Sequence, residues 1–347
     1  MMNKSFLFLA IVGVFGLPNT SVSESHDWPA YGRGSGGGNF SLASEITPEN
    51  VGQLRQAWVH RSGDYHQGND WTKDKVIDSS LQTSFQATPI LVEDTLFYCS
   101  PYNKVIALDP ASGEERWVFD PKIDPEGKGI LHCRGVSSWV DDSLSESATC
   151  RHRIISATIE SELLSIDAAT GRLCEGFGNS GRVNLRSGLG DHDHGLYYST
   201  SPPAIIGDLI IVGGSVADNV SVDVPGGVVR AYDARSGELV WYWDPIHPDQ
   251  KPVLDEDGSQ RYQRGTTNVW SIISVDPELN QIYLPTGNTS PDNYGGHRNG
   301  SDYYSSSVVS LEATTGKVLW HFQTVHHDVW DYDVPSQPTF YEFQKDG

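Results

Sequence analysis

Residues 107–117 read ALDPASGEERW, and the same pattern recurs three more times along the chain. The other copies are SIDAATGRLCE at 165–175, AYDARSGELVW at 231–241 and SLEATTGKVLW at 310–320. In every copy an acidic residue is followed four positions later by Gly, and in three copies Trp follows four positions after the Gly, whereas Glu175 takes that place in the copy at 165–175. A spacing this regular indicates repeated structural units.

A hairpin turn accounts for the residue types in the repeat. The acidic side chain can accept hydrogen bonds from turn N–H groups, Gly supplies a positive φ, and Trp leaves the outer strand to pack on the neighbouring unit. Short β-rich runs such as LIIVGGS precede the copies, sustained helical periodicity is almost absent, and Trp58 resembles a degenerate earlier copy. Repeats of about 60 residues built from short strands favour propeller blades, with a sandwich carrying coincidental turns as the alternative. We therefore predict an all-β propeller of four-stranded blades.

The charge of the chain limits its partners. Lys and Arg number 24 against 45 Asp and Glu in 347 residues, which gives a net charge of −21. Such a chain repels phosphate backbones at long range, so a nucleic-acid partner is not expected.

The first 25 residues have the features of a secretory signal peptide. Lys4 is followed by an apolar run from Phe6 to Leu17 and then by small or polar residues. The run is too short to span a bilayer comfortably. We predict export to the periplasm and a single domain over residues 26–347.

Export changes the interpretation of the four cysteines. An oxidising compartment lets them pair, and no C-x-x-C spacing suggests structural zinc. We predict two disulfides between sequence neighbours, Cys99 with Cys133 and Cys150 with Cys174.

Three loops could carry chemistry. The run SVADNVSVDVPGG at 215–227 follows an apolar strand and offers Asp218 and Asn219, and LPTGNTSPD offers Asn288 at another strand end. Carboxylate and amide oxygens suit a hard cation such as Ca²⁺, although a capped turn uses the same residues. The stretch TVHHDVWDYDVPSQP at 324–338 fits a metal site, a positioned catalytic carboxylate or a polar loop. GRGSGG at 32–37 matches a dinucleotide motif only by letter, because no strand precedes it and no helix follows.

Long stretches of the chain resemble the pyrroloquinoline quinone (PQQ) dehydrogenases. The resemblance covers nearly all of residues 28–340 and is carried by WPAYGRGSGGGNFSLASEITPENVGQLRQAW, ATPILVEDTLFYCSPYNKVIALD, HCRGVS, TSPPAIIGDLIIVGGSVADN, PTGNTSPDNYGG and TVHHDVWDYDVPSQPT. The nearest group is the membrane-type glucose, quinate and polyol dehydrogenases. The resemblance implies an eight-bladed propeller with PQQ and Ca²⁺ on its axis. About half the ring is visible, so the chain looks C-terminally truncated.

By position, the resemblance assigns Asp218 and Asn288 as Ca²⁺ ligands, with Asn219 as a third. It also assigns a catalytic base and several cofactor contacts. The base is Asp331, and the cofactor contacts are Trp270 beneath the PQQ ring, Arg134 at a PQQ carboxylate, Thr158, and Gln86 beside the cofactor.

This chain departs from the family pattern in places. Gln86 stands in FQATP where relatives carry Glu, and Ile130 stands where relatives carry His, with His132 nearby. A lysine expected near the quinone oxygens lies beyond Gly347, and a signal peptide replaces the N-terminal membrane bundle of the glucose enzymes.

The implied reaction is oxidation of a hydroxyl group of a sugar, polyol or cyclic hydroxy acid. Hydride passes to PQQ with help from Ca²⁺ and the Asp331 base, and electrons continue to ubiquinone or a cytochrome, with peripheral membrane association possible. Asp328, Asp333, His326 and His327 are then orienting groups or polar loop residues. The alternatives are a simple alcohol dehydrogenase, which typically carries two adjacent cysteines where Cys133 stands alone, and a non-catalytic exported scaffold.

Overall fold

The computed structural model describes residues 27–34, 36–65, 82–125, 130–193, 195–251, 253–254, 260–341 and 343–345. The predicted signal peptide, residues 1–25, lies outside these ranges. Within them the chain is β-sheet and loop, and the single helical element is the short 3-10 turn η1 (Val51–Gln53). No helix of the described residues has the length and apolar character needed to cross a membrane.

Four antiparallel sheets of four strands each dominate the structure, and we call them blades 1 to 4 in chain order. Blade 1 consists of β2 (Ile90–Val92), β3 (Thr95–Cys99), β4 (Val105–Leu108) and β5 (Glu115–Phe119). Blade 2 consists of β7 (Ser137–Val140), β8 (His152–Ala157), β9 (Glu162–Asp167) and β10 (Arg182–Asn184). Blade 3 consists of β12 (Ala204–Ile206), β13 (Leu209–Val212), β15 (Val229–Asp233) and β16 (Leu239–Trp243). Blade 4 consists of β19 (Ser274–Asp276), β20 (Gln281–Pro285), β21 (Ser307–Glu312) and β22 (Val318–Gln323).

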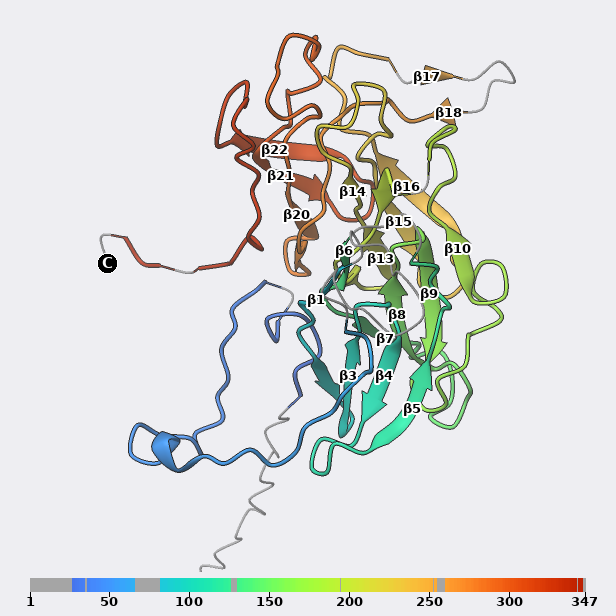
Figure 1. Ribbon diagram of the computed structural model, residues 1–347, viewed down its shortest axis with the longest axis vertical. Coiled ribbons are helices and arrows are strands. Elements are labelled where there is room, and N and C mark those ends of the chain that lie inside the picture. The colour runs from blue at the N-terminus through green and yellow to red at the C-terminus, as the bar shows by residue number, and fades with distance from the viewer. Residues whose placement is uncertain are drawn as a thin grey trace, which may run out of the picture.

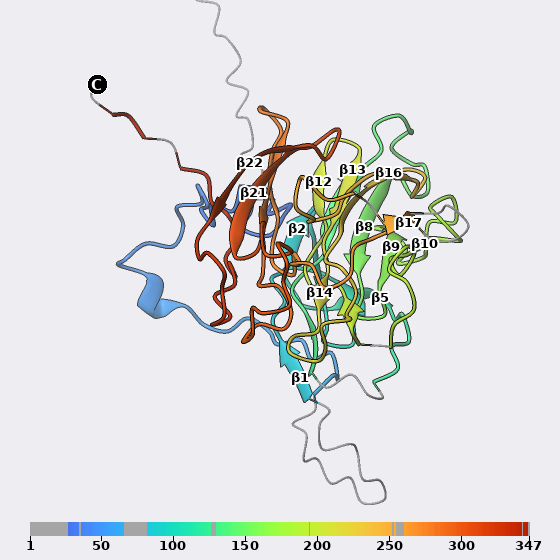
Figure 2. The same ribbon diagram turned by 90° about the horizontal axis from the view of Figure 1, so that it is seen from above.

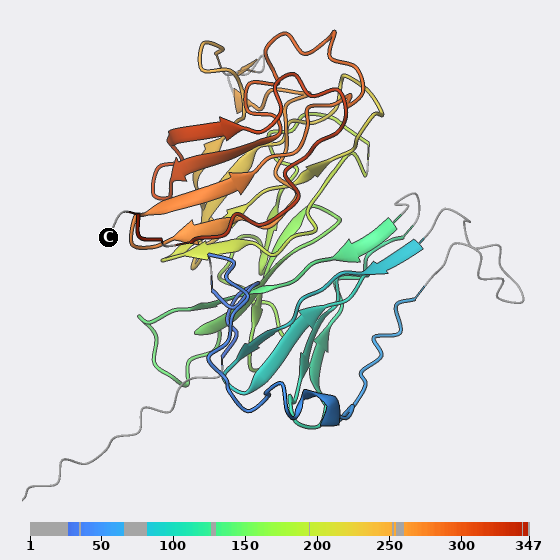
Figure 3. The same ribbon diagram turned by 90° about the vertical axis from the view of Figure 1, so that its left-hand side faces the viewer.

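The blades follow one another in chain order, from blade 1 at one end of the arc to blade 4 at the other (Figure 3). Their first strands β7, β12 and β19 are neighbours, so these strands line the inner side of the arc. The predicted all-β propeller architecture of four-stranded blades is confirmed.

Three two-stranded pairs complete the sheet structure. They are parallel β1 (Gln82–Phe85) with β6 (Ile130–Cys133), antiparallel β11 (Tyr197–Tyr198) with β14 (Ser215–Val216), and antiparallel β17 (Val253–Leu254) with β18 (Gln260–Arg261). The first two pairs position residues named in the sequence analysis, because Arg134 follows β6 and Asp218 follows β14.

The repeated turn follows the third strand of each blade and leads directly into the fourth strand in blades 1, 3 and 4, whereas in blade 2 residues 173–181 separate it from β10. In blade 1 the Asp109 carboxylate accepts hydrogen bonds from the N–H groups of Ala111 and Ser112, at 3.0 and 2.9 Å. The Gly of each copy has a φ between 69° and 74°, a backbone conformation that Gly adopts without steric cost.

Three of the repeat tryptophans, Trp58, Trp117 and Trp241, dock on the turn of the blade that follows them. The indole Nε1 donates a hydrogen bond to a turn carbonyl in three places: Trp58 to Pro110 at 3.1 Å, Trp117 to Ala168 at 2.9 Å and Trp241 to Ala313 at 2.8 Å. A Cβ atom added to the Gly of each turn would clash with the docked indole. We call these contacts the Trp joints. They fix the spacing between neighbouring blades.

The joint between blades 2 and 3 uses different residues, because Glu175 replaces the Trp. Phe177 lies against Gly237 of the next turn, and the Gly178 N–H donates to the Ser236 carbonyl at 2.7 Å. Arg153 adds two hydrogen bonds of 2.9 Å to the carbonyls of residues 234 and 235. The contact between blades 2 and 3 therefore lies at the same position of the repeat but is made by different residues.

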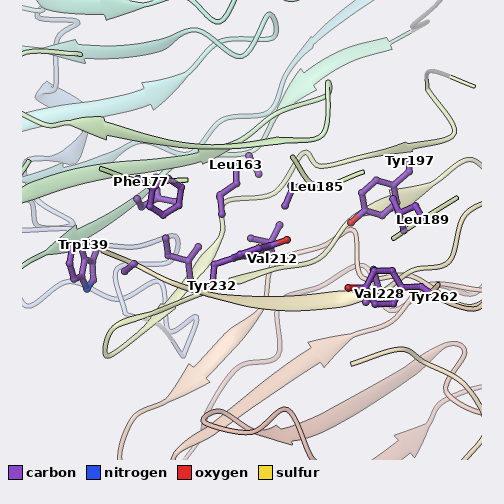
Figure 4. Packing of buried hydrophobic residues seen from close by; sticks show 14 of the residues in the cluster. Trp139, Leu163, Phe177, Leu185, Leu189, Tyr197, Val212, Val228, Tyr232 and Tyr262 are labelled. Atoms are coloured by element: carbon purple, nitrogen blue, oxygen red, sulfur yellow. The ribbon is translucent and has the colours of Figure 1, made fainter. Parts of the chain in front are cut away.

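Apolar side chains fill the space between adjacent blades. The largest cluster joins blades 2 and 3 and contains Trp139, Leu163, Phe177, Val212 and Tyr232 (Figure 4). Similar clusters lie between blades 1 and 2 and between blades 3 and 4. Each blade is thus stabilised by burial against its neighbour.

Two disulfides form with the predicted pairing. Cys99 bonds to Cys133 and so ties β3 to the strand that leads to Arg134. Cys150 bonds to Cys174 within blade 2.

The N-terminal and C-terminal segments of the described chain lie on the same side of the molecule (Figures 1 and 2). The Phe340 N–H donates to the Gly36 carbonyl at 3.2 Å, and a Cβ atom at Gly36 would overlap the Phe340 ring. The glycines of the 32–37 run therefore allow this close backbone approach, in agreement with the rejection of a dinucleotide motif.

Candidate active site

Loops from three blades meet on the inner side of the arc. The Arg134 N–H donates to the Thr200 carbonyl at 2.8 Å, and the Ser201 hydroxyl donates to the Trp270 carbonyl at 2.6 Å. The Gly287 N–H donates to the Asn268 carbonyl at 2.8 Å. We call the group of side chains gathered here the axial site, which consists of Arg134, Asp218, Asn219, Trp270, Asn288, Asp292, Asp331 and Asp333.

Arg134 and Trp270 form one side of the axial site. The guanidinium carbon of Arg134 lies 4.9 Å from the centre of the Trp270 ring, and its Nη1 donates to the Thr200 hydroxyl. Burial lowers the pKa of Arg134, although Tyr198 and Tyr31 act in the opposite direction. A cation beside an indole suits a planar, anionic ligand.

Asp333 connects Trp270 to the Asn288 loop. One carboxylate oxygen accepts the Trp270 Nε1–H at 2.6 Å, and the other accepts the Asn288 backbone N–H. The fixed indole and the fixed loop therefore share one acceptor.

The loop that carries Asp218 and Asn219 meets the loop that carries Asn288. The Asn219 side chain donates to the Asp292 carboxylate at 2.8 Å and accepts the Asp292 N–H at 3.0 Å. The Asn288 Nδ2 in turn donates to the Asp292 carbonyl at 3.2 Å. Residues seventy positions apart are thus brought into one network.

Asp292 is a site residue that the sequence analysis did not single out. It is 1% exposed, and it contacts two of the predicted Ca²⁺ ligands, Asn219 and Asn288. The sequence feature that could have pointed to Asp292 is that it is the only carboxylate in the oxygen-rich run LPTGNTSPD.

Three carboxylates of the axial site have raised pKa values, caused first by burial and then by the charges of neighbouring carboxylates. Surrounding protein atoms raise the pKa of Asp218 to about 6, with further contributions from Asp333 and Asp331, even though Asp218 is solvent-exposed. Burial and then Asp218 raise the pKa of Asp292 to about 7, and burial also raises the pKa of Asp333. Binding of a divalent cation would relieve the repulsion between these carboxylates, although no three of them in the described residues gather closely enough to ligate one ion.

A buried oxygen near Trp270 is also free for a ligand. Asn268 is 4% exposed, and its Oδ1 has no hydrogen-bond partner among the described residues. A buried oxygen without a partner, two residues before Trp270, is a candidate acceptor for a polar group of a ligand.

Asp331 and Asp328 have different environments although both belong to the stretch 324–338. Asp331 is exposed, has a φ of 62°, and its charge acts on Asp218, Asp292 and Asp333. Asp328 is fully buried, and its carboxylate accepts the N–H groups of Trp330 and Tyr332 at 2.9 and 2.7 Å. Asp328 therefore shapes the loop, whereas Asp331 presents a carboxylate at the site.

The histidines of this stretch bind elsewhere. His326 contacts Gln323 at 2.7 Å, and His327 contacts Asp302 at 2.8 Å with its side chain 61% exposed. No three His, Cys, Asp or Glu side chains of the described residues gather as metal ligands. The predicted Ca²⁺ set, one carboxylate and two amides, is of another kind.

Three further residues named from the sequence have these positions. Thr158 is fully buried, and its hydroxyl accepts the Glu162 N–H at 3.2 Å inside the β8–β9 turn. Gln86 is exposed and donates to the Ser84 hydroxyl at 3.1 Å. The His132 ring is set edge-on to Tyr198, and burial followed by the Arg134 charge lowers its pKa.

Comparison with known proteins places these features in one family. The family model described as "PQQ: Glucose/ethanol/alcohol dehydrogenase, beta-propeller domain" matches residues 28–347. The chain is 40% identical to the quinoprotein glucose dehydrogenase of Escherichia coli K12, over 94% of this chain and 40% of that protein. It is 39% identical to the glycerol dehydrogenase large subunit of Gluconobacter oxydans, over 93% of this chain and 42% of that protein.

A third relative and a solved structure agree. The quinate/shikimate dehydrogenase (quinone) of Acinetobacter baylyi is 36% identical over 95% of this chain and 41% of that protein. The crystal structure of the quinohemoprotein alcohol dehydrogenase of Comamonas testosteroni superposes with a TM-score of 0.66 at 26% identity, covering 90% of this chain and 43% of that chain. The chain thus spans about two-fifths of the length of these curated relatives.

Proposed function

Because the chain belongs to the PQQ-dependent dehydrogenases with a β-propeller domain, we propose that it oxidises a hydroxyl group of a sugar, polyol or cyclic hydroxy acid. The observation that carries the proposal is the axial site, where Asp333 is bonded to Trp270 and Asn288 and where the charge of Asp331 acts on Asp218. Glucose, glycerol and quinate enzymes are the named relatives, which supports a substrate with several hydroxyl groups.

The bound groups would be PQQ and Ca²⁺. PQQ supplies a quinone carbonyl that accepts hydride, and a cation at that carbonyl makes it more electrophilic. Trp270 supports the flat ring, and the Arg134 guanidinium binds a ring carboxylate. Asp218, Asn219 and Asn288 hold the cation, while Gln86 and Thr158 contact the cofactor edge.

The proton of the substrate hydroxyl is assigned to Asp331. An alcohol releases hydride as its proton leaves, so an exposed carboxylate at the site is suited to accept that proton. Asp331 meets this requirement better than Asp328 and Asp333, whose oxygens are already engaged by N–H and O–H donors.

Electrons leave the site to a separate acceptor in this proposal. The acceptor is ubiquinone or a cytochrome, and the protein acts in the periplasm with peripheral contact to the membrane. The word "quinone" in the name of the quinate/shikimate relative supports a quinone acceptor.

One observation bears on the simple alcohol dehydrogenase alternative. Cys133 is bonded to Cys99, which lies 34 residues away in the sequence, so it is not part of an adjacent cysteine pair. This difference favours the sugar and polyol type.

The test adds PQQ and Ca²⁺ to the purified full-length protein and follows dye reduction with aldoses, polyols, quinate and simple alcohols. We expect reduction that needs both additions and prefers the polyhydroxylated substrates. A preference for simple alcohols would select the alternative enzyme. Absence of both PQQ binding and dye reduction with every substrate would favour a non-catalytic scaffold.

A further inference from the structure

We infer that Asp333 is a positioning residue that locks the Trp270 indole and the Asn288 loop into one rigid unit, an inference that rests on the proposed function for its role toward PQQ. The two oxygens of its carboxylate are divided between two elements. Oδ2 accepts the Trp270 Nε1–H at 2.6 Å, and Oδ1 accepts the Asn288 backbone N–H. These donors come from the loop before β19 and the loop after β20.

The backbone around Asp333 is built for this contact. The Val334 N–H donates to the Thr286 carbonyl at 3.1 Å, which aligns residues 333–334 with the end of β20. A Cβ atom at Gly287 would lie 3.1 and 3.2 Å from the two Asp333 oxygens and 3.2 Å from Trp270 Cδ1. A larger residue at this position would make a tight contact, and the carboxylate or the indole edge would have to shift by a few tenths of an ångström.

The two hydrogen bonds of Asp333 matter because an indole that supports a flat cofactor must keep a fixed orientation. The Trp side chain rotates about two torsions, and a hydrogen bond to Nε1 fixes the second of them. The Arg134 guanidinium lies 4.9 Å from the ring centre, so a rotation of the indole would also disturb that contact. Preorganisation of this kind improves ligand affinity by reducing the entropy lost on binding.

The chemistry of the contact requires a carboxylate. Asp333 offers two acceptor oxygens to two donors, and a charged acceptor makes the stronger hydrogen bonds. An Asn at this position offers one oxygen and one NH₂ group, so one donor would face another donor. Asp333→Asn therefore breaks one half of the lock, and Asp333→Ala breaks both halves.

Asp331 and Asp333 consequently have separate tasks although one residue separates them. Asp331 is exposed and has a left-handed backbone, whereas Asp333 is half-buried and bonded to Trp270 and Asn288. Asp331→Asn is therefore a matched control that changes the same charge in the same loop without touching the indole.

The first arm of the test uses the cofactor-free protein. Tryptophan indoles are labelled with ¹⁵N, and the Trp270 resonance is assigned by its loss in Trp270→Phe. We expect the Trp270 Nε1–H to exchange with solvent about 10-fold faster or more in Asp333→Ala than in the wild type, and to keep its rate in Asp331→Asn. An unchanged exchange rate in Asp333→Ala would overturn the inference.

The second arm measures PQQ binding by tryptophan fluorescence at fixed Ca²⁺. Loss of a charge-assisted hydrogen bond should raise the dissociation constant about 10- to 100-fold in Asp333→Asn and Asp333→Ala. In a Trp270→Phe background, Asp333→Ala should raise the PQQ dissociation constant much less than it does in the wild type, because Asp333 acts through the indole. An equal additional loss in both backgrounds, with a weakened Ca²⁺ requirement, would identify a metal ligand and contradict the inference.

The two arms separate this inference from the proposed function. If the wild type binds no PQQ, the proposed function fails, while indole exchange still decides whether Asp333 holds Trp270. If the wild type binds PQQ and the Asp333 variants bind it equally well, the inference alone fails.

Discussion

The Trp joints and the axial site both use a Trp indole that donates a hydrogen bond over a glycine, but the joints hold blades together and the axial site arranges candidate ligand-binding residues. At the joints, one arrangement recurs: an indole N–H donates to a turn carbonyl over a glycine, at distances of 2.8 to 3.1 Å. In the axial site the indole of Trp270 also donates over a glycine, but its acceptor is the Asp333 carboxylate, and no other loop repeats the contact within the described chain. The contacts that hold the blades together are therefore repeated along the chain, whereas the contact in the candidate active site occurs once among the described residues.

This difference predicts how substitutions will separate. A residue at a Trp joint contributes burial between blades, so its loss should lower the free energy of unfolding. A residue of the axial site lies on loops whose charges repel one another, so its loss should change ligand binding or turnover more than stability. Four variants and their controls test this separation.

The largest effect is expected for Asp331→Asn. The amide keeps the size of the side chain but cannot accept the substrate proton, so turnover should fall by roughly 10²- to 10⁴-fold. PQQ binding and the Ca²⁺ requirement should stay close to those of the wild type. Turnover and PQQ binding are measured separately. Weakened Ca²⁺ and PQQ binding would make Asp331 a ligand, and near-normal turnover would return it to a polar loop.

Trp241→Ala should give the next largest effect, this time on stability. Trp241 is 8% exposed and is bonded to the next turn, so its truncation should lower the free energy of unfolding by about 3–5 kcal/mol. Trp320 holds the same place in the repeat but is 45% exposed, so Trp320→Ala is the matched control and should cost less than half as much. Denaturant titrations of both variants provide the measurement. Equal losses would show that docking does not stabilise the joint.

Gly316→Ala tests the other half of the same joint. The residue has a φ of 69°, and an added Cβ atom would clash with the docked Trp241. Gly300 has a φ of 86° with no atom near its Cβ position, so Gly300→Ala should show the backbone cost alone, about 1–2 kcal/mol. Overpacking should add about 1–3 kcal/mol at Gly316. Thermal unfolding of the two variants provides the measurement. Equal losses of stability in Gly316→Ala and Gly300→Ala would argue against close packing at the joint.

Asp244→Asn addresses a carboxylate outside both regions and should have the smallest effect. Burial raises the pKa of Asp244 to about 6, against the lowering influence of its hydrogen bond from the Gln263 N–H. A raised carboxyl pKa means that the folded state binds the proton more tightly, so this contribution to stability is lost as pH rises from about 4 to about 6. Asn does not ionise, so it avoids the cost of holding a buried carboxylate in its charged form at high pH.

We therefore expect Asp244→Asn to be more stable than the wild type at pH 8 by about 2 kcal/mol, with the difference shrinking toward pH 4. Ca²⁺ should not alter this difference, because burial and not a neighbouring carboxylate causes the shift. Denaturation at both pH values, with and without Ca²⁺, provides the measurement. A difference that is independent of pH would contradict the assignment.

The repeated joints could be predicted because their signal is periodic. The acidic residue, the Gly and the Trp each have a local or nearest-neighbour task, so their spacing in the sequence carries the architecture. The joint between blades 2 and 3 could not be predicted in detail. Glu175 interrupts the pattern, and nothing periodic points to Phe177 or Arg153 as replacements.

The axial site was partly predictable for a related reason. The resemblance identified Arg134, Trp270 and Asn288, and the structure brings their loops together. The contacts of Asp333 and Asp292 were not predictable, because they join residues 45 to 73 positions apart through one or two hydrogen bonds each. Such contacts leave no periodic trace in one sequence.

The most direct test of the central claim is an equilibrium titration of the purified protein with PQQ, followed by tryptophan fluorescence with and without Ca²⁺. The axial site predicts saturable quenching that needs Ca²⁺, that weakens strongly in Trp270→Ala and Asp218→Ala, and that is unaffected by Trp320→Ala. Absence of saturable binding, or binding that ignores both Ca²⁺ and the axial substitutions, would contradict the account.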